Sequence, residues 1–265
     1  MDEVTMDALT QLLSHRSIRN FSSREVPSAL LDQILGAAAR APTAGNLQSY
    51  SAIITRDPER RADLFEIHFR QEMVLHAPVV VTICVDVRRN TRWMEGQGAE
   101  PGFLNFWGFL VGMADAWCAT QNIVIAAEHF GLGTCPSGGT FIKALNLIDY
   151  FHCPRGVIPV ATLVLGYPSL DESEVEKVRP RLPLAAWTHE ERYSDRSVEA
   201  LASDYSEREK IDGEYYKNLY GLEGVGHELA AQNLAQIYTR LKYKKLETAL
   251  FSSNFIAALK RQGFL

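Results

Sequence analysis

One long stretch, Phe109 to Phe130, constrains the fold more than any other, because apolar residues occupy almost every side of the helix that it predicts. A helix that is apolar all round belongs inside a domain. Gly131 is well placed to end it, since glycine readily adopts the left-handed conformation that follows a helix. The wider stretch from Phe103 to Ala126 predicts a buried helix rather than a membrane span, because it also carries four polar residues, Asn105, Asp115, Gln121 and Asn122.

Runs of β-branched residues predict interior strands. Val79 to Asp86 and Gly156 to Gly166 are rich in Val and Ile, which is typical of strands covered on both faces. Gly133 to Gly139 is expected to be a loop that follows the long helix. Three further elements are predicted by spacing: helices over Met6 to Ser14 and Ser28 to Arg40, and a strand over Ser51 to Thr55.

Length and charge bound the kind of partner. The 265 residues contain no long Gly/Pro/Ser linker, which favours one domain over 1–265. A formal net charge of −5 with mixed signs makes nucleic acid or an anionic membrane an unexpected partner and favours a small molecule. Four well-separated cysteines and an acidic N-terminus without an apolar run favour a cytoplasmic protein with reduced thiols.

The last third of the chain differs in character from the rest. Residues 195–247 are charged, contain several tyrosines and are helix-prone, so we expect a peripheral helical excursion there. In segment 251–265, Phe255, Leu259 and Phe264 predict a terminal helix and tail that dock on an apolar surface.

Two pairs of arginines are candidates for binding phosphate. His15, Arg16, Ser17 and Arg19 follow the first predicted helix, and Arg179 and Arg181 flank Pro180. Guanidinium groups give forked, charge-assisted hydrogen bonds to phosphate oxygens. The alternatives are that the first group complements the negative end of a helix dipole and that the second is a solvated loop.

Two loops are candidates for contacting a planar heterocycle. The loop 42–48 supplies a hydroxyl and two amides just before a strand, through Pro42, Thr43, Ala44, Asn46 and Gln48; an ordinary turn is the alternative. The second loop, Pro136, Ser137, Gly138 and Gly139, carries paired glycines that allow close approach of the backbone. It is not a dinucleotide fingerprint, because Pro136 occupies the third glycine position of G-x-G-x-x-G and the segment follows a helix.

The order and spacing of these segments resemble the nitroreductase family of FMN enzymes, in particular its oxygen-insensitive NADPH nitroreductase and flavin reductase branch. The most diagnostic words are His-Arg-Ser-Ile-Arg at 15–19 and Arg-Pro-Arg-Leu-Pro at 179–183, and the resemblance covers roughly residues 5–192 and the last dozen residues. It implies an α+β fold, with a mixed, mainly antiparallel sheet surrounded by helices in an intertwined homodimer. Segment 251–265 would dock on the partner subunit, and FMN would lie at the subunit interface.

The resemblance also implies roles for residues. Arg16, Arg19, Arg179 and Arg181 would hold the phosphate and ribityl end of FMN, with His15 and Ser17 beside them. Thr43, Asn46, Gln48 and Gln71 would address the ring and its neighbourhood, and segment 136–139 would line the ring edge near N5. No catalytic side chain and no metal site are expected.

The implied activity is ping-pong, two-electron reduction of nitroaromatics, quinones or free flavin, with NADPH or NADH as donor and hydride transfer through flavin N5. The alternatives are an offshoot with reductive dehalogenase or flavin-fragmenting chemistry, and a non-catalytic flavin-binding protein. Two regions do not indicate which substrate the protein reduces. One is a possible lid at 87–102, and the other is 195–247, which matches the branch poorly and whose cations are expected on solvated helix faces: Arg208, Lys210, Lys217 and Lys242.

Overall fold

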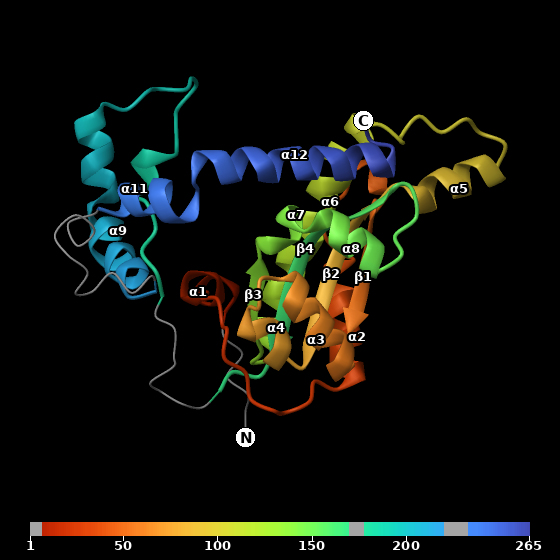
Figure 1. Ribbon diagram of the computed structural model, residues 1–265, viewed down its shortest axis with the longest axis horizontal. Helices are drawn as coiled ribbons and strands as arrows, with labels where there is room; N and C mark the ends of the chain where they lie inside the picture. Colours follow the sequence, from red (N-terminus) through yellow and green to blue (C-terminus); the bar gives the residue numbers. More distant parts are fainter. Residues whose placement is uncertain (1–6, 170–177, 220–232) are drawn as a thin grey trace. The chain divides into compact units, whose positions relative to one another are not determined.

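The structure is a computed structural model that describes residues 7–169, 178–219 and 233–265 (Figure 1). The chain divides into two compact units. Unit 1 comprises Met1–Glu176 with Phe251–Leu265, and unit 2 comprises Lys177–Leu250. The single FMN-binding domain expected over 1–265 stays a prediction.

Unit 1 is built on a four-stranded sheet with the strand order β1-β2-β4-β3, in which each strand pair is antiparallel. The strands are β1 (Tyr50–Thr55), β2 (Val79–Asp86), β3 (Gly133–Ser137) and β4 (Val157–Gly166). Every residue of β2 and of β4 is buried, which confirms the interior strands expected from their β-branched composition. The expected α+β class is therefore confirmed.

The prediction of a loop over 133–139 is wrong for most of that segment. Gly133 to Ser137 form β3, with Cys135 opposite Val164 and Pro136 opposite Leu163 of β4. Proline lacks an N–H group, and it is tolerated here because β3 is an edge strand. Pairing with a strand that lies distant in the sequence decides this structure, and glycine and proline gave no local sign of it.

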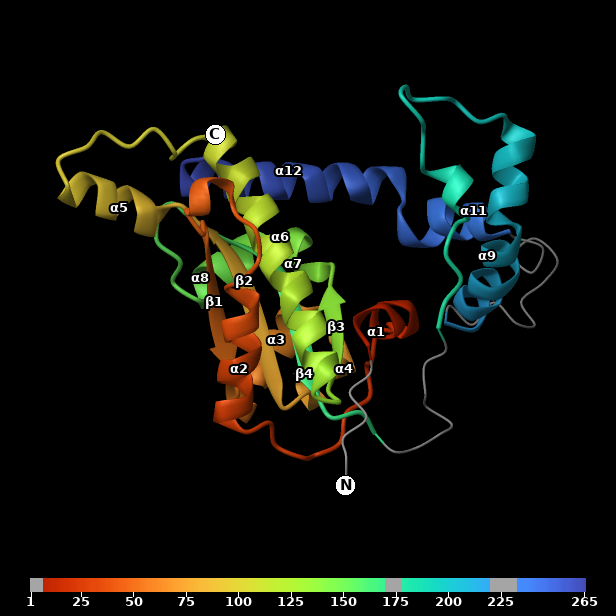
Figure 2. The ribbon, with the colours of Figure 1, turned by 180° about the vertical axis from the view of Figure 1, so that it is seen from behind.

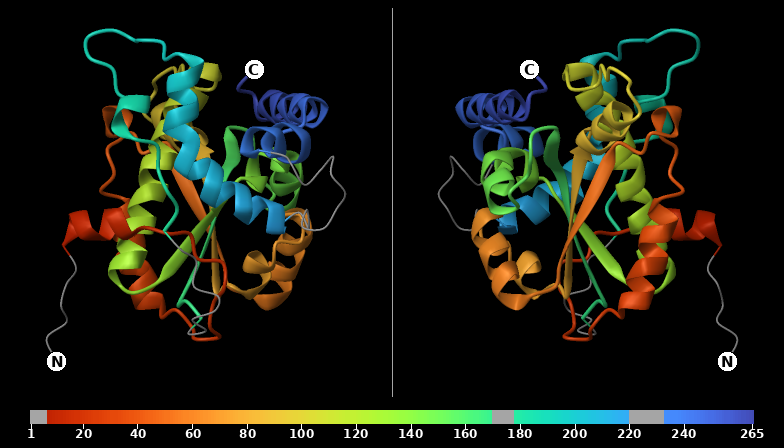
Figure 3. Two further views of the ribbon diagram at one scale, coloured as in Figure 1. Left: turned by 90° about the vertical axis from the view of Figure 1, so that its left-hand side faces the viewer. Right: turned by 90° about the vertical axis from the view of Figure 1, so that its right-hand side faces the viewer.

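Helices cover both faces of the sheet. The helices α2 (Ser28–Ala38) and α6 (Phe106–His129) pack on one face (Figure 2), while α3 (Pro58–Ile67), α4 (Glu72–His76) and α8 (Ala144–Tyr150) pack on the other (Figure 1). Figure 3 shows the same layers seen from the side. Unit 1 also contains α1 (Ala8–Ser14), η1 (Ala44–Asn46), α5 (Arg88–Gly96) and α7 (Gly139–Ile142).

The long helix α6 organises the core. Asn105 caps its start by accepting a hydrogen bond of 2.9 Å from the N–H group of Gly108. By length and composition α6 could cross a membrane, but core helices of globular proteins pass the same test. It packs against α2 and the sheet, and Phe109 and Ile123 are among its buried residues, as expected for a helix inside a domain.

The C-terminal segment completes this core. Helix α12 (Lys245–Gln262) is followed by Gly263, which adopts φ 81°, and by Phe264, which is 1% exposed. The Phe264 ring lies 5.5 Å from that of Phe109. The tail therefore docks on an apolar surface, as the sequence predicts, and the Phe109–Phe264 contact lies within one chain. Docking of segment 251–265 on the partner subunit stays a prediction.

The described residues 198–219 and 234–250 of unit 2 are largely helical, in line with the expected helical excursion. Unit 2 contains η3 (Leu184–Ala186), α9 (Val198–Leu219), α11 (Leu234–Ile237), a π-helical turn η4 (Tyr238–Lys242) and the first residues of α12. Aromatic contacts among Tyr216, Tyr238 and Tyr243 hold these short elements together.

Candidate functional site

The basic segment 15–19 lies along the edge strand β3. The N–H group of Ile18 donates to the carbonyl oxygen of Thr134 at 2.8 Å. Gly133 makes this approach possible, because a Cβ atom there would lie 2.5 Å from the Cβ of Ile18. His15 contacts Glu128 of α6 through Nδ1 at 2.5 Å. The segment is thus held by a backbone hydrogen bond to β3 and by a side-chain contact with α6.

The exposure of this segment differs along the chain. His15, Ser17 and Arg19 are half-buried, as is Ile18, whereas Arg16 is exposed. The placement of Arg16 on the opposite side from His15, Ser17 and Arg19 stays a prediction.

The loop 42–48 is held by a buried carboxylate that the sequence reasoning did not single out. Asp115 of α6 is 2% exposed; its Oδ1 accepts from the N–H group of Ala44 at 3.0 Å and its Oδ2 from that of Ser49 at 3.1 Å. Buried carboxylates require such donors, because an unpaired buried charge is strongly unfavourable. The available signal was an acidic residue in the middle of an otherwise apolar helix.

Between Ala44 and Ser49 the backbone adopts left-handed conformations at three residues. Gly45, Asn46 and Gln48 adopt φ values of 58°, 56° and 52°. Left-handed conformations are cheap for glycine, tolerated by asparagine and unfavourable for glutamine. The Nε2 group of Gln48 donates to Oδ1 of Asn46 at 3.3 Å, so the two amides expected to address a ring lie side by side.

An apolar pocket of about 430 Å³ opens beside this loop. The hydroxyl oxygen of Thr43 is buried and, within the described ranges, has no hydrogen-bond partner. The other lining residues are Pro42, Ala44, Trp107, Leu110, Val111, Ala114, Asp115 and Cys118. An unpaired buried hydroxyl next to an apolar pocket can serve a polar atom of a mostly apolar ligand.

The structure brings three of the other predicted residues into contact. The hydroxyl of Ser137 donates to Oε1 of Gln71 at 2.9 Å, and the N–H group of Gly139 donates to that hydroxyl at 3.3 Å. Pro136 is half-buried at the sheet edge and Gly138 is exposed. A Cβ atom on Gly138 would meet nothing within 4 Å, so the space in front of this backbone is open.

A buried histidine contacts this cluster, and it was not predicted from the sequence. His68 is fully buried, with Nδ1 3.5 Å from the hydroxyl of Ser137. Burial lowers the pKa of His68 from 6.5 to about 4, so its ring is neutral at neutral pH. In the part of the chain that the structure describes, its Nε2 has no hydrogen-bond partner. No motif or spacing in the sequence around His68 indicates that it contacts a site.

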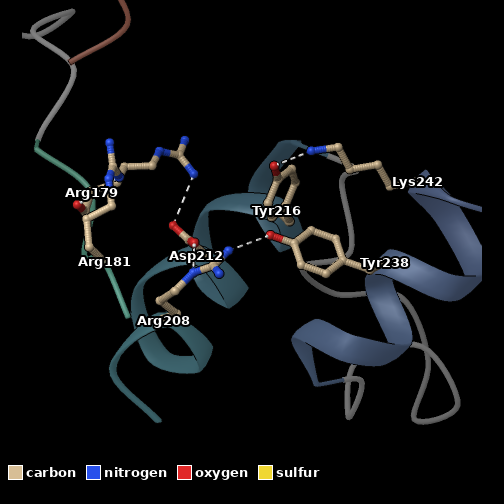
Figure 4. Close-up of polar contacts among 7 residues, drawn as sticks. All are labelled: Arg179, Arg181, Arg208, Asp212, Tyr216, Tyr238 and Lys242. Atoms are coloured by element: carbon tan, nitrogen blue, oxygen red, sulfur yellow. Dashed lines mark hydrogen bonds and ion pairs between the residues drawn. The ribbon is translucent and has the colours of Figure 1, made fainter. Parts of the chain in front are cut away.

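In unit 2, Arg179 and Arg181 line a cavity of about 740 Å³ (Figure 4). Arg179 Nη1 lies 3.2 Å from Oδ1 of Asp212, whose Oδ2 contacts Nε of Arg208 at 3.2 Å. Arg181 donates to the carbonyl oxygen of Arg179 at 3.2 Å. The buried carboxylate of Asp212 thus holds two guanidinium groups in place.

For two further cations of this cavity, the structure differs from what the sequence predicts. Arg208 and Lys242 were expected on solvated helix faces, but both line the cavity. Arg208 Nη2 donates to the hydroxyl of Tyr238 at 3.2 Å, and Lys242 Nζ donates to that of Tyr216 at 2.6 Å. The reason is the turn from α11 into η4, which directs Tyr238 and Lys242 towards α9 (Figure 4). Four cations and one carboxylate make this cavity strongly attractive to anions.

The predicted residues therefore fall into separate groups. Unit 1 holds the basic segment 15–19, the loop 42–48 and the Gln71–Ser137–Gly139 cluster, and unit 2 holds Arg179 and Arg181. The convergence of the two arginine pairs on one phosphate stays a prediction.

Comparison with known proteins identifies the class to which this fold and these sites belong. Residues 12–72 and 66–167 match the Nitroreductase family. A solved structure of an oxidoreductase from Bacteroides fragilis NCTC 9343 superposes with a TM-score of 0.88 at 33% identity, covering 96% of this chain and 99% of that one. The structure of NfrA2 from B. megaterium gives 0.78 at 31% identity, covering 98% of each chain.

The chain belongs to the nitroreductase family, as its resemblance predicts. It is 31% identical over 259 residues to a protein of Bacillus subtilis (strain 168) named FMN reductase [NAD(P)H], covering 94% of this chain and 98% of that protein. It is also 26% identical over 197 residues to NADPH-flavin oxidoreductase of Vibrio harveyi, covering 74% of this chain and 79% of that protein.

Proposed function

We propose that this protein is an FMN-dependent NAD(P)H oxidoreductase that reduces nitroaromatics, quinones or free flavin by two electrons in a ping-pong reaction. The observation that carries the proposal is the open, side-chain-free backbone at Gly138, next to the Ser137–Gln71 hydrogen bond, in a chain of this family. Glycine at such a position allows a flat ring to approach the backbone closely.

The residues present fit FMN in three respects. The cavity of unit 2 offers Arg179 and Arg181 to a phosphate. The unpaired hydroxyl of Thr43 and the adjacent amides of Asn46 and Gln48 suit the polar edge of an isoalloxazine ring. Gly138 leaves the space that the ring needs.

The roles of the chain are binding and orientation. Arg16, Arg19, Arg179 and Arg181 would hold the phosphate and ribityl end, and His15 and Ser17 would lie beside them. Asp115 fixes the loop that carries Thr43, Asn46 and Gln48, so these groups are pre-positioned. FMN, when bound, would supply two-electron redox chemistry between NAD(P)H and the oxidant. We assign no catalytic side chain.

A homodimer with FMN at the subunit interface belongs to the proposal. Trp107, Leu110 and Trp117 of α6 are exposed, and Trp107 is 67% exposed. Leu9, Leu12 and Leu13 of α1 are exposed as well. Large apolar side chains gathered on one unit favour contact with another protein surface, and a second copy is the proposed occupant. Cys84, Cys118 and Cys153 are free thiols, which supports a cytoplasmic location.

The test is FMN retention in arginine variants. Arg19→Ala and Arg181→Ala each remove a charged phosphate contact of about 1.5 to 3 kcal/mol, which corresponds to about a 10- to 150-fold rise in the Kd for FMN. Lys210→Ala, on the exposed side of α9, is the matched control and is expected to leave the Kd unchanged. Wild-type affinity in both arginine variants would contradict the phosphate clamp.

Catalysis is tested by anaerobic bleaching. Purified protein is expected to be yellow and to lose its colour on addition of NADPH or NADH, and to regain it with a nitroaromatic, a quinone or FMN. Yellow protein that neither nucleotide reduces would indicate a non-catalytic flavin-binding protein. Protein that takes up no FMN would end the proposal.

A further inference from the structure

An aromatic residue occupies a position where glycine would be favoured, at the end of α3. The N–H group of His68 donates to the carbonyl oxygen of Leu64 at 2.8 Å, and that of Arg70 donates to Phe65 at 2.9 Å. The second bond, from C″ back to C3, is the 6→1 bond of a Schellman-type helix end, in which the left-handed C′ residue is usually glycine. Here that residue is Phe69, with φ 58°, and Arg70 follows with φ 55°. Two successive left-handed residues that are not glycine store backbone strain.

Burial of the ring does not account for this strain. Phe69 is 49% exposed, so the strained backbone presents an aromatic side chain to solvent. An exposed aromatic held in an unfavourable conformation calls for a role on the surface where it lies.

That surface adjoins the proposed flavin edge. A Cβ atom on Gly139 would lie 3.4 Å from two carbons of the Phe69 ring, so the ring rests against the Gly139 backbone. The ammonium group of Lys143, which follows α7, lies 4.8 Å from the centre of the same ring. Phe69, Gly139 and Lys143 thus place an aromatic surface and a cation side by side.

We propose that Phe69 and Lys143 form a specificity subsite for the oxidising substrate and that this subsite favours planar aromatic anions, such as nitroaromatic carboxylates. The inference rests on the proposed function, because it takes Gly138 and Gly139 as neighbours of the flavin ring. The open part of the Phe69 ring offers offset stacking to a second ring. The Lys143 ammonium supplies attraction to a carboxylate on that ring.

NAD(P)H, the donor proposed above, supplies the electrons that reduce the substrate bound at this subsite. The nitro group takes up the hydride that originates from NAD(P)H together with one proton, releases one oxygen as water and becomes a nitroso group. Phe69 and Lys143 take no part in bond making, and they act on which oxidant binds and how it is oriented.

The experiment compares 4-nitrobenzoate with uncharged nitrobenzene in steady-state kinetics of the FMN-loaded enzyme. Phe69→Gly is expected to lower kcat/KM for both compounds about 5- to 10-fold through loss of stacking. The same change is expected to raise the melting temperature, because glycine relieves the left-handed strain. Lys143→Gln is expected to lower the ratio of kcat/KM for 4-nitrobenzoate to that for nitrobenzene about fivefold.

Arg70→Gly is the matched control. It relieves the same kind of strain at the next residue, whose side chain is exposed and pairs with Glu66 at 2.8 Å. It is expected to raise the melting temperature without changing either kcat/KM value. A role of Phe69 in stability alone would make Phe69→Gly behave like Arg70→Gly.

The outcomes separate this inference from the proposed function. FMN-loaded, NAD(P)H-reducible protein in which Phe69→Gly and Lys143→Gln both keep wild-type kcat/KM values would overturn the subsite and leave the oxidoreductase intact. Failure of the wild-type protein to bind FMN or to be reduced would overturn the oxidoreductase itself. Lys143→Gln alone decides the preference for anions if Phe69→Gly does not fold.

Discussion

At the scale of single residues, Asp115 holds the loop 42–48 in place, although the sequence did not indicate it as a site residue. It is a charged group inside the core, and two backbone N–H groups of one loop satisfy it. One carboxylate therefore holds the backbone both at Ala44 and at Ser49, directly after the loop.

Replacement of Asp115 by asparagine keeps the size of the side chain but leaves only one carbonyl oxygen for two donors. We expect a loss of about 1 to 3 kcal/mol in the free energy of unfolding, measured with urea, because one buried N–H group loses its acceptor. The Kd for FMN is expected to rise in the same variant. Asp32→Asn, on the exposed side of α2, is the control, and an equal loss in both variants would refute the anchoring role.

His68 gives the protein a stability that depends on pH. Burial lowers its pKa to about 4, so between about pH 4 and pH 6.5 the unfolded chain binds more protons than the folded chain. Its contribution is therefore fully present above about pH 6.5, is lost as the pH falls toward 4, and amounts to about 3 kcal/mol.

The variant His68→Gln tests this dependence, since glutamine does not titrate. Urea unfolding of His68→Gln at intervals from pH 4.5 to pH 7.5 is expected to show a flatter profile than that of the wild type. Parallel profiles for His68→Gln and the wild type would show that His68 does not titrate as proposed.

At the scale of elements, two glycines with opposite surroundings test how β3 holds the basic segment. Gly133→Ala would force a Cβ atom against Ile18, so we expect a loss of about 1 to 3 kcal/mol in stability and weaker FMN retention. Gly36→Ala, at an exposed position in the last turn of α2, meets nothing within 4 Å and is expected to gain about 0.5 to 1 kcal/mol. Thermal unfolding and FMN titration of both variants provide the comparison. A stabilised Gly133→Ala variant would show that Ile18 yields freely.

The elements also show what a sequence can reveal. β2, β4 and α6 were predictable, because each carries its own pattern of apolar residues along the chain. β3 was not, since its glycine and proline indicate a turn and its structure comes from pairing with β4. The polar loops were recognisable by composition, whereas Asp115 and His68 contribute through three-dimensional contacts that no local spacing encodes.

At the scale of the whole molecule, the exposed apolar face of α6 is the feature that a dimer would explain. Trp107→Glu places a charge on that face, and we expect a shift from dimer to monomer in analytical ultracentrifugation together with reduced FMN retention. Ala62→Glu, on the exposed side of α3, is the control. A Trp107→Glu variant that stays dimeric would place the subunit interface elsewhere.

The burial of Phe264 against Phe109 has a consequence for biosynthesis. The ribosome makes the sheet and α6 first, then all of unit 2, and only afterwards the residues that cover Phe109. A nascent chain therefore carries an uncovered patch of unit 1 throughout translation of unit 2. Premature termination within unit 2 would release a polypeptide that lacks Phe264, so its Phe109 would stay uncovered. Such exposed apolar surface is bound by chaperones and makes the polypeptide a target of proteases.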